Sequence, residues 1–236
     1  MKPIFTIVVL FFTVQLSAQD TAAFFADANA FFATHVTNGR VDYKTIKSDP
    51  SSLNDLLSQA AKIKVTAENK AIYKSFWINT YNLAVIKGVV SKYPVDSPLK
   101  IGGFFDNKTF NVGGIQTTLN NIENKLLRAK FPTEPRFHFV LVCAGLGCPP
   151  LIGEAYAPDK LENQLQQQTT LALNDPNFIK VIGNKVQISQ IFEWYKEDFT
   201  KNGSVIKFIN SFRREAIPTK AKVSYYSYDW TLNDSE

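Results

Sequence analysis

One stretch, residues 137–150 with the sequence FHFVLVCAGLGCPP, constrains the fold more than any other part of the chain. It begins with apolar and β-branched residues and ends with two glycines and a Pro-Pro pair. This pattern predicts a buried strand that ends in a tight loop. The stretch holds both cysteines of the chain and one of its two histidines. Reactive groups on a loop that a rigid scaffold holds are the first place to look for chemistry.

Residues 1–18 are typical of a secretory signal peptide. Lys2 supplies the positive start, residues 4–14 form an apolar core too short to span a bilayer, and small residues end at a cleavage site after Ala18. We therefore expect residues 19–236 to form a single globular domain outside the cytoplasm, either periplasmic or secreted. No cysteine follows the apolar core, so we expect no lipid anchor. No later segment is long and apolar enough to cross a membrane.

The composition and charge limit which classes of partner we expect. A chain of 236 residues with 45% hydrophobic content is suited to one domain with a sizeable core. Removal of Lys2 with the signal peptide leaves 25 basic and 21 acidic residues. This excess is mild, and the basic residues near the C-terminus alternate with apolar ones, as on a solvated helix face. We therefore expect no nucleic-acid partner, and a small molecule or a peptide as ligand.

The hydrophobic periodicity predicts an α+β fold, a helix-rich domain around a small mixed or antiparallel sheet. Helices are expected over residues 21–35, 51–63, 66–93, 119–130, 158–174, 189–199 and 204–212. Thr66, Thr118 and Ser189 are the expected caps of three of them. The sheet is expected to contain the segments 104–112, with a hairpin turn near Asp106–Asn107, 137–143, 178–188 and 223–230.

Three polar residues lie on helix faces that are otherwise apolar. Asn79 and Asn82 belong to the 66–93 helix, and Glu123 lies four residues from both Leu119 and Leu127. A buried amide without partners costs about 1–3 kcal/mol, so each must bond something specific. We favour the interpretation that the asparagines brace a neighbouring backbone over direct substrate contact. A buried carboxylate needs a cation, a histidine or several donors.

Three interpretations of the 137–150 stretch remain open. In the first, Cys143 and Cys148 form a disulfide, as exported proteins often do. In the second, a thiol is a nucleophile that His138 activates, and Glu123 or Asn79 orients the imidazole. Alternation along a straight strand places His138 and Cys143 on opposite faces, so this pairing needs a bend. In the third, His138 and both cysteines bind zinc, although no fourth ligand is evident.

The glycine pairs at 102–103 and 113–114 lack the spacing that cradles phosphate. We therefore expect no cofactor, and we assign no metal site.

Five motifs in order resemble one protein family. They are FWINTYN at 76–82, VGG at 112–114, Ile122–Glu123, the 138–150 stretch with its CPP end, and IFEWYKEDF at 191–199. Together they resemble the family called domain of unknown function 547 (DUF547) over about residues 41–199. The resemblance implies no settled activity. It implies that the family's recurrent polar positions are the candidate site residues, here Asn79, Asn82, Glu123, His138, Cys143, Cys148 and Asp198.

The chain departs from the family pattern in the cysteine loop. The family loop usually reads Cys-Gly-x-x-Ser-Cys-Pro, whereas Ala144 and Gly147 stand at its glycine and serine positions. This favours a structural loop, or a reaction that needs only cysteine and histidine.

The sequence therefore predicts an exported domain of unknown activity with a polar pocket around the 138–148 segment. The alternative is a cysteine-dependent hydrolase of acyl or amide bonds. Its catalytic candidates are Cys143 as nucleophile, His138 as base and Glu123 as orienting group. Its binding candidates are Asn79, Asn82, Cys148 and Asp198.

Overall fold

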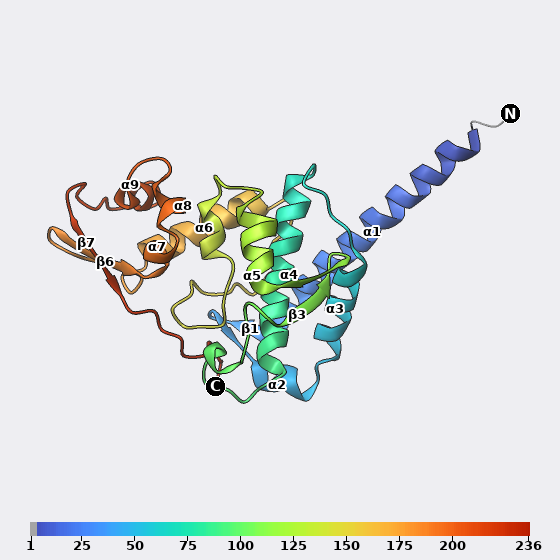
Figure 1. Cartoon of the computed structure of the whole chain (residues 1–236), viewed down its shortest axis with the longest axis horizontal. Coiled ribbons are helices and arrows are strands. Elements are labelled where there is room, and N and C mark those ends of the chain that lie inside the picture. Colours follow the sequence, from blue (N-terminus) through green and yellow to red (C-terminus); the bar gives the residue numbers. More distant parts are fainter. Residues whose placement is uncertain (1–3) are drawn as a thin grey trace.

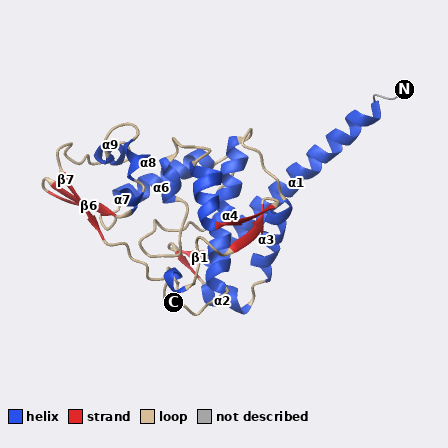
Figure 2. Ribbon diagram, in the orientation of Figure 1, coloured by secondary structure: helices blue, strands red, loops and turns tan. Residues whose placement is uncertain are grey.

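A computed structural model describes the backbone of residues 4–236 and the side chains of residues 19–236. The predicted signal peptide, residues 1–18, lies outside the residues whose side chains are described. The fold is α+β, as predicted: helices predominate, and the strands form separate small sheets (Figures 1 and 2). Figure 1 shows helices α1 to α5 gathered in one half of the molecule, with strands β6 and β7 and helices α7 to α9 in the other.

The first half is built around one buried helix. Its helices are α1 (Ile4–His35), α2 (Tyr43–Ser48), α3 (Ser51–Lys62), α4 (Lys70–Val90), the 3₁₀ turn η1 (Pro98–Lys100), α5 (Leu119–Asn121) and the π-helix η2 (Ile122–Arg128). Its strands are β1 (Val36–Thr37), β2 (Arg40–Val41), β3 (Thr109–Val112) and β4 (Ile115–Thr118). Helix α4 is buried along most of its length, as expected for a helix that is apolar on nearly every side.

Helix α4 starts later than predicted. The side chain of Asn69 accepts a hydrogen bond from the Ile72 N–H at 3.2 Å, so Asn69 is the cap and Thr66 lies outside the helix. The helix ends at Val90 rather than Tyr93.

The second half carries its own hydrophobic core and one mixed sheet. Its elements are the 3₁₀ helix η3 (Pro135–Phe139), α6 (Leu161–Asn174), β5 (Ile179–Ile182), β6 (Lys185–Ser189), α7 (Ile191–Trp194), α8 (Lys196–Thr200), α9 (Val205–Asn210) and β7 (Lys222–Tyr226). Strands β5 and β6 form the predicted hairpin, and β7 pairs in parallel with β6. Helix α6 begins at Leu161 rather than Pro158.

The four predicted strand segments do not share one sheet. Only 178–188 and 223–230 contribute to the three-stranded sheet. The hairpin expected within 104–112 is instead β3 and β4, joined at Gly113–Gly114. These glycines have φ of +64° and +73°, and a type I′ hairpin turn needs positive φ at both central positions. The side chain of Trp77 also leaves no space for a Cβ at Gly113.

The strand predicted over 137–143 is wrong. Residues up to Phe139 form η3, and residues 140–143 then follow as a turn and loop outside any strand. The segment is apolar because it lies between the two hydrophobic cores. Val140 belongs to the first core and Phe139 to the second. A segment buried from both sides is as apolar as a central strand, so the pattern alone cannot separate the two.

Two predicted helices are interrupted, and both interruptions lie beside the candidate site. The 119–130 helix starts at the predicted cap Thr118 but widens into η2 from Ile122 onward. The 189–199 helix breaks at Tyr195 into α7 and α8. Glu123 and Tyr195 therefore stand at irregular turns, the kind of position often found at functional sites.

The C-terminal tail, residues 227–236, crosses back to the first half. The Gly147 N–H donates to the Asp229 carbonyl at 2.7 Å, and the Leu146 N–H donates to the Thr231 carbonyl at 2.8 Å. Farther along, the Val41 N–H donates to the Asn233 carbonyl at 2.9 Å. The tail thus fixes the cysteine loop against both halves.

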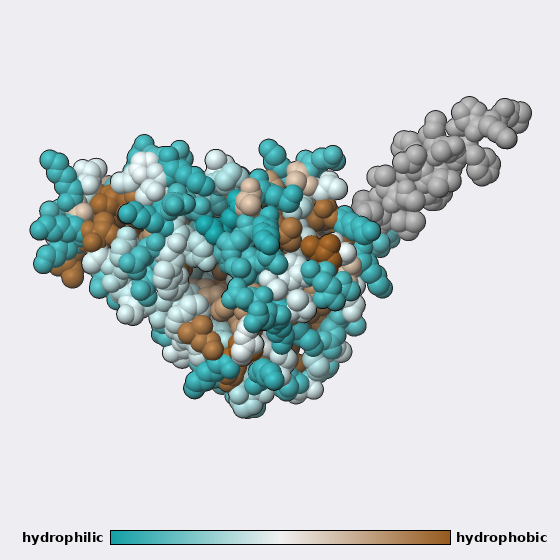
Figure 3. All heavy atoms as spheres, in the orientation of Figure 1, coloured by the Kyte–Doolittle hydropathy of each residue, from teal (hydrophilic) through white to brown (hydrophobic). Residues whose placement is uncertain are grey.

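On the face shown in Figure 3, hydrophobic side chains form separate patches on a largely hydrophilic surface. Within the described part of the chain, no helix combines the length and the apolar character that a membrane crossing requires.

Candidate functional site

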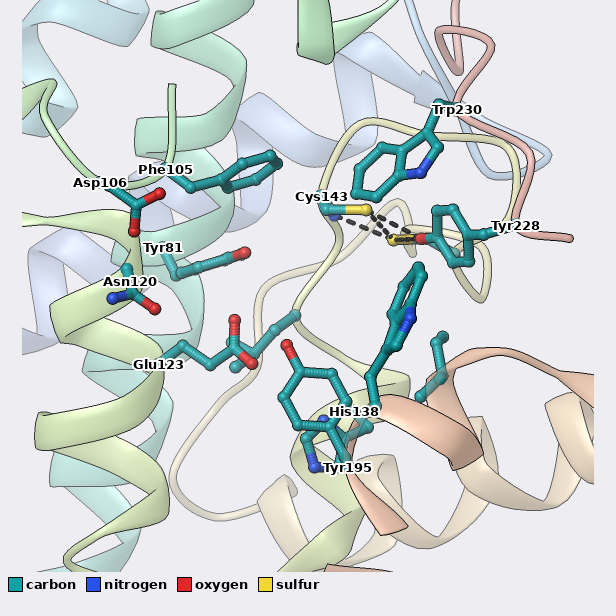
Figure 4. Close-up of a pocket in the computed structure, with 14 residues that line it drawn as sticks. Tyr81, Phe105, Asp106, Asn120, Glu123, His138, Cys143, Tyr195, Tyr228 and Trp230 are labelled. Atoms are coloured by element: carbon teal, nitrogen blue, oxygen red, sulfur yellow. Dashed lines mark hydrogen bonds between the residues drawn. The ribbon is translucent and has the colours of Figure 1, made fainter. Parts of the chain in front are cut away.

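A cavity of about 320 Å³ opens beside the cysteine loop (Figure 4). One wall comes from α4, the turn before β3 and the α5–η2 helix, and it consists of Tyr81, Phe105, Asp106, Asn120 and Glu123. The facing wall comes from the cysteine loop, α7 and the C-terminal tail, and it consists of Cys143, Cys148, Trp194, Tyr228 and Trp230. The remaining lining residues are His138, Leu141, Ile191 and Tyr195.

The two cysteines are free and half-buried in the cavity wall. Their Sγ atoms are 2.7 Å apart. The Tyr228 hydroxyl lies 2.9 Å from the Cys143 Sγ and 2.8 Å from the Cys148 Sγ. The Cys143 N–H donates to the Cys148 Sγ at 3.0 Å. The disulfide stays a prediction, and these two sulfur atoms are close enough that its formation would need only a small movement.

The surroundings favour a thiolate at Cys143 over one at Cys148. Burial alone opposes a thiolate at both positions. At Cys143, hydrogen bonds from the Cys148 thiol and the Tyr228 hydroxyl outweigh burial, so the pKa of this thiol is lowered. At Cys148, burial and the neighbouring Cys143 sulfur act together and raise the pKa. A lowered thiol pKa is the property that makes a cysteine reactive.

His138 borders the same cavity but bonds to neither sulfur within the described structure. Its Nε2 atom lies 2.9 Å from the Asp198 Oδ2, which also accepts from the Arg128 Nε at 2.7 Å. Its ring lies against the ring of Tyr195, with centroids 4.1 Å apart. The structure therefore does not join His138 and Cys143 as the base–nucleophile pair of the alternative hydrolase hypothesis.

Asp198 is held in its ionised form by these partners. Burial raises the pKa of its carboxyl, but hydrogen bonds from His138 and Arg128 more than offset burial and bring the pKa well below its usual value. Asp198 does not line the cavity. Its carboxylate fixes the position of His138 and does not face a ligand in this cavity.

Glu123 faces the cavity, and Tyr195 stands between it and His138 (Figure 4). Burial, and then the charge of Glu123, raise the pKa of Tyr195. The same two causes, in the same order, raise the pKa of Tyr81. The expected contact in which Glu123 orients the His138 imidazole is not formed.

Asn79 and Asn82 lie outside the cavity and brace neighbouring backbone, as the favoured interpretation predicted. The Asn79 amide donates to the Tyr156 carbonyl at 2.8 Å and accepts from the Tyr156 N–H at 2.9 Å. The Asn82 amide donates to the Val140 carbonyl and accepts from the Val142 N–H, both at 2.9 Å. Each amide thus satisfies one carbonyl and one N–H of a loop segment.

The structure accounts for the glycine at position 147 but not for Ala144. Ala144 has φ of +66°, the left-handed region that glycine adopts most easily. A Cβ at Gly147 would lie 2.8 Å from the Tyr228 ring and 2.9 Å from the Asp229 nitrogen. Serine does not fit there without displacing the tail. Glycine at this position therefore allows Tyr228 to pack on the cysteine loop.

Six aromatic residues of the cavity were missed as site residues. They are Tyr81, Phe105, Trp194, Tyr195, Tyr228 and Trp230. Tyr228 and Trp230 share one face of the segment predicted as a strand, a signal of burial rather than of a cavity wall.

Among the described residues, no three His, Cys, Asp or Glu side chains converge as a metal site would require.

Comparison with family models gives one match. The model described as "Protein of unknown function, DUF547" matches residues 65–171. Comparisons with curated proteins and with solved structures gave no match. The matched region includes the wall with Glu123 and both cysteines, whereas Trp194, Tyr195, Tyr228 and Trp230 lie beyond it. In this region the chain resembles a family whose description states no function.

Proposed function

We propose that this chain, similar to the DUF547 family over residues 65–171, is an exported domain that binds a small organic molecule in the cavity beside the cysteine loop. The observation that carries the proposal is the convergence of polar and aromatic side chains from segments far apart in the sequence on one hollow. A mostly apolar pocket with a few convergent polar groups is the usual form of a small-molecule site. The volume of about 320 Å³ suits a ligand of a few tens of heavy atoms at most.

The three tryptophans supply a binding assay with an internal control. Trp194 and Trp230 line the cavity, whereas Trp77 is buried beside Gly113 and does not. The protein labelled with fluorotryptophan gives one fluorine resonance for each, assigned by Trp194→Phe and Trp230→Phe. We would titrate three probes on one scaffold: benzyl alcohol, phenylacetate and benzyltrimethylammonium. We expect at least one to shift the two cavity resonances and leave Trp77 unmoved. If no probe does so, the proposal fails.

The second candidate function is a thiol hydrolase in which Cys143 is the nucleophile. The lowered pKa of Cys143 favours it, with Tyr228 and Cys148 rather than His138 as the stabilising groups. The thiolate would add to an ester carbonyl, forming a C–S bond while the C–O bond breaks and the alcohol leaves with the electron pair. Water would then attack the thioester, releasing the acid and a proton and restoring the thiolate.

The probe for this reaction is p-nitrophenyl acetate. We expect the wild type to release nitrophenolate and to carry one acetyl group on Cys143, and Cys143→Ala to do neither. The matched control is Lys160→Ala, an exposed change outside the cavity. Equal rates for the wild type and Cys143→Ala would remove this candidate.

Export is part of the same proposal, since residues 1–18 have the charge, length and cleavage site of a signal peptide. N-terminal sequencing of the protein recovered from outside the cytoplasm is expected to begin at Gln19. Protein that remains inside the cell and begins at Met1 would contradict it.

A further inference from the structure

We infer that the cavity recognises an organic cation, an ammonium group with carbon substituents, held between the Glu123 carboxylate and the aromatic wall. The inference rests on the proposed function, because it names the ligand class of the same cavity. Three independent features carry it: the arrangement of rings, the charges of the lining residues and an unpartnered hydroxyl.

The rings form a continuous aromatic wall. The centroids of Tyr228 and Trp230 are 4.7 Å apart, those of Trp194 and Tyr228 are 5.1 Å apart, and those of Trp194 and Trp230 are 6.1 Å apart. Phe105 approaches these rings from the opposite wall, with its centroid 6.1 Å from that of Trp230. The face of an aromatic ring is electronegative and attracts a cation placed over it. Several such rings around one hollow are the arrangement that binds alkylated ammonium groups.

Acidic side chains outnumber basic ones in the lining of the cavity. Glu123 and Asp106 line the cavity, and none of the 14 lining residues is lysine or arginine. The ion pairs among the described residues include neither carboxylate. Arg128 lies 4.6 Å from the Tyr195 ring but is paired with Asp198, as is His138. The half-buried Glu123 therefore has no cationic side chain of its own.

The Tyr81 hydroxyl supplies the third feature. Tyr81 is 2% exposed, and Figure 4 shows its hydroxyl pointing into the space between the walls. No side chain or backbone group in the described structure forms a hydrogen bond with it. This hydroxyl is open to the cavity, so it is free to bind a polar atom of the ligand next to its charged end.

Other ligand classes fit less well. An anion would meet Glu123, Asp106 and the Cys143 sulfur, with no lysine or arginine in the lining to balance them. A neutral ligand would contact the rings but leave Glu123 without a counter-charge. A cation with apolar substituents would pair with the Glu123 carboxylate and contact the aromatic rings at the same time.

The test compares choline with 3,3-dimethylbutan-1-ol, a neutral molecule of the same shape in which carbon replaces the ammonium nitrogen. Binding is measured from the fluorine shifts of Trp194 and Trp230. We expect choline to bind at least about tenfold more tightly than the alcohol. Glu123→Gln, which keeps the shape of the side chain, is expected to remove that difference, and the exposed control Glu215→Gln is expected to preserve it.

The outcomes separate the inference from the proposed function. If both molecules bind equally well to the wild type, the cavity binds ligands but does not select a cation, and only the inference fails. If neither they nor the benzyl probes shift the cavity resonances, the proposed function fails as well. Alcohol binding retained in Glu123→Gln shows that this variant is folded, so its loss of choline selectivity can be attributed to the carboxylate.

Discussion

At the scale of residues, the Tyr228 hydroxyl lies 2.9 Å from one sulfur and 2.8 Å from the other, whereas His138 bonds to Asp198. In a Cys148→Ser background, which leaves one thiol, we expect Tyr228→Phe to slow alkylation of Cys143 by iodoacetamide about tenfold near neutral pH. Loss of a hydrogen bond to a charged group costs about 1.5–3 kcal/mol, which raises the thiol pKa. We expect His138→Ala to leave the rate within about twofold. A slowing in His138→Ala as large as that in Tyr228→Phe would restore the histidine to a role in activation.

The packing at Gly147 gives a second prediction at this scale. A Cβ there would meet the Tyr228 ring and the Asp229 backbone below 3 Å, whereas Gly102 has open space around it. We expect Gly147→Ser to lower the free energy of unfolding by about 1–3 kcal/mol and Gly102→Ser to change it by less than about 1 kcal/mol. Urea unfolding measures both. Similar values for the two variants would show that the tail yields freely to a side chain at position 147.

At the scale of elements, α4 supports the cysteine loop through one amide. Asn82 satisfies a carbonyl and an N–H of the loop segment that leads to Cys143, and it is 1% exposed. We expect Asn82→Ala to lower the free energy of unfolding by about 2–5 kcal/mol, because two buried backbone groups lose their partner. Asn202→Ala, at an exposed position, is the control, with an expected change below about 0.5 kcal/mol. A loss as small as that of the control would mean that water replaces the amide.

Most helices and the β5–β6 hairpin could be predicted because their signals are local. Helix spacing, caps such as Thr118 and the Gly183–Asn184 turn act within a few residues. The segment after Phe139 could not be assigned, because its backbone partner is a side chain 58 residues earlier in the chain. The break at Tyr195 likewise interrupts a pattern that is helical on both sides, so the position of its ring cannot be obtained from periodicity.

At the scale of the molecule, the candidate site forms where two cores meet, and this explains which site residues were found. Glu123, His138, Cys143 and Cys148 carry chemically reactive groups, so their residue types were enough to select them. The aromatic wall comes from α7 and the tail, more than 40 residues beyond the cysteine loop. Nothing within those segments indicates that they face a cavity rather than a core.

Asp198 links three elements of the molecule, since it bonds to His138 of η3 and Arg128 of η2 from its place in α8. Its folded pKa is lower than its ordinary value of 3.8, so its ionised form stabilises the fold above that pH. This contribution is lost as the pH falls below 3.8 towards the folded pKa. We therefore expect Asp198→Asn to be destabilised at about pH 5, and the difference from wild type to shrink below about pH 4.

Urea unfolding across this pH range measures the effect of Asp198. The exposed Asp159→Asn is the control, with an expected change below about 0.5 kcal/mol at neutral pH. A difference between wild type and Asp198→Asn that stays constant down to pH 3 would mean that the loss comes from packing rather than from the charge.

The most direct measurement on the cavity is a crystal structure of the protein with benzyltrimethylammonium. We expect the cation to occupy the cavity, with its ammonium group between the Glu123 carboxylate and the rings of Tyr228 and Trp230. An empty cavity at a saturating concentration of this probe, or a cation bound only elsewhere on the surface, would contradict the proposed site.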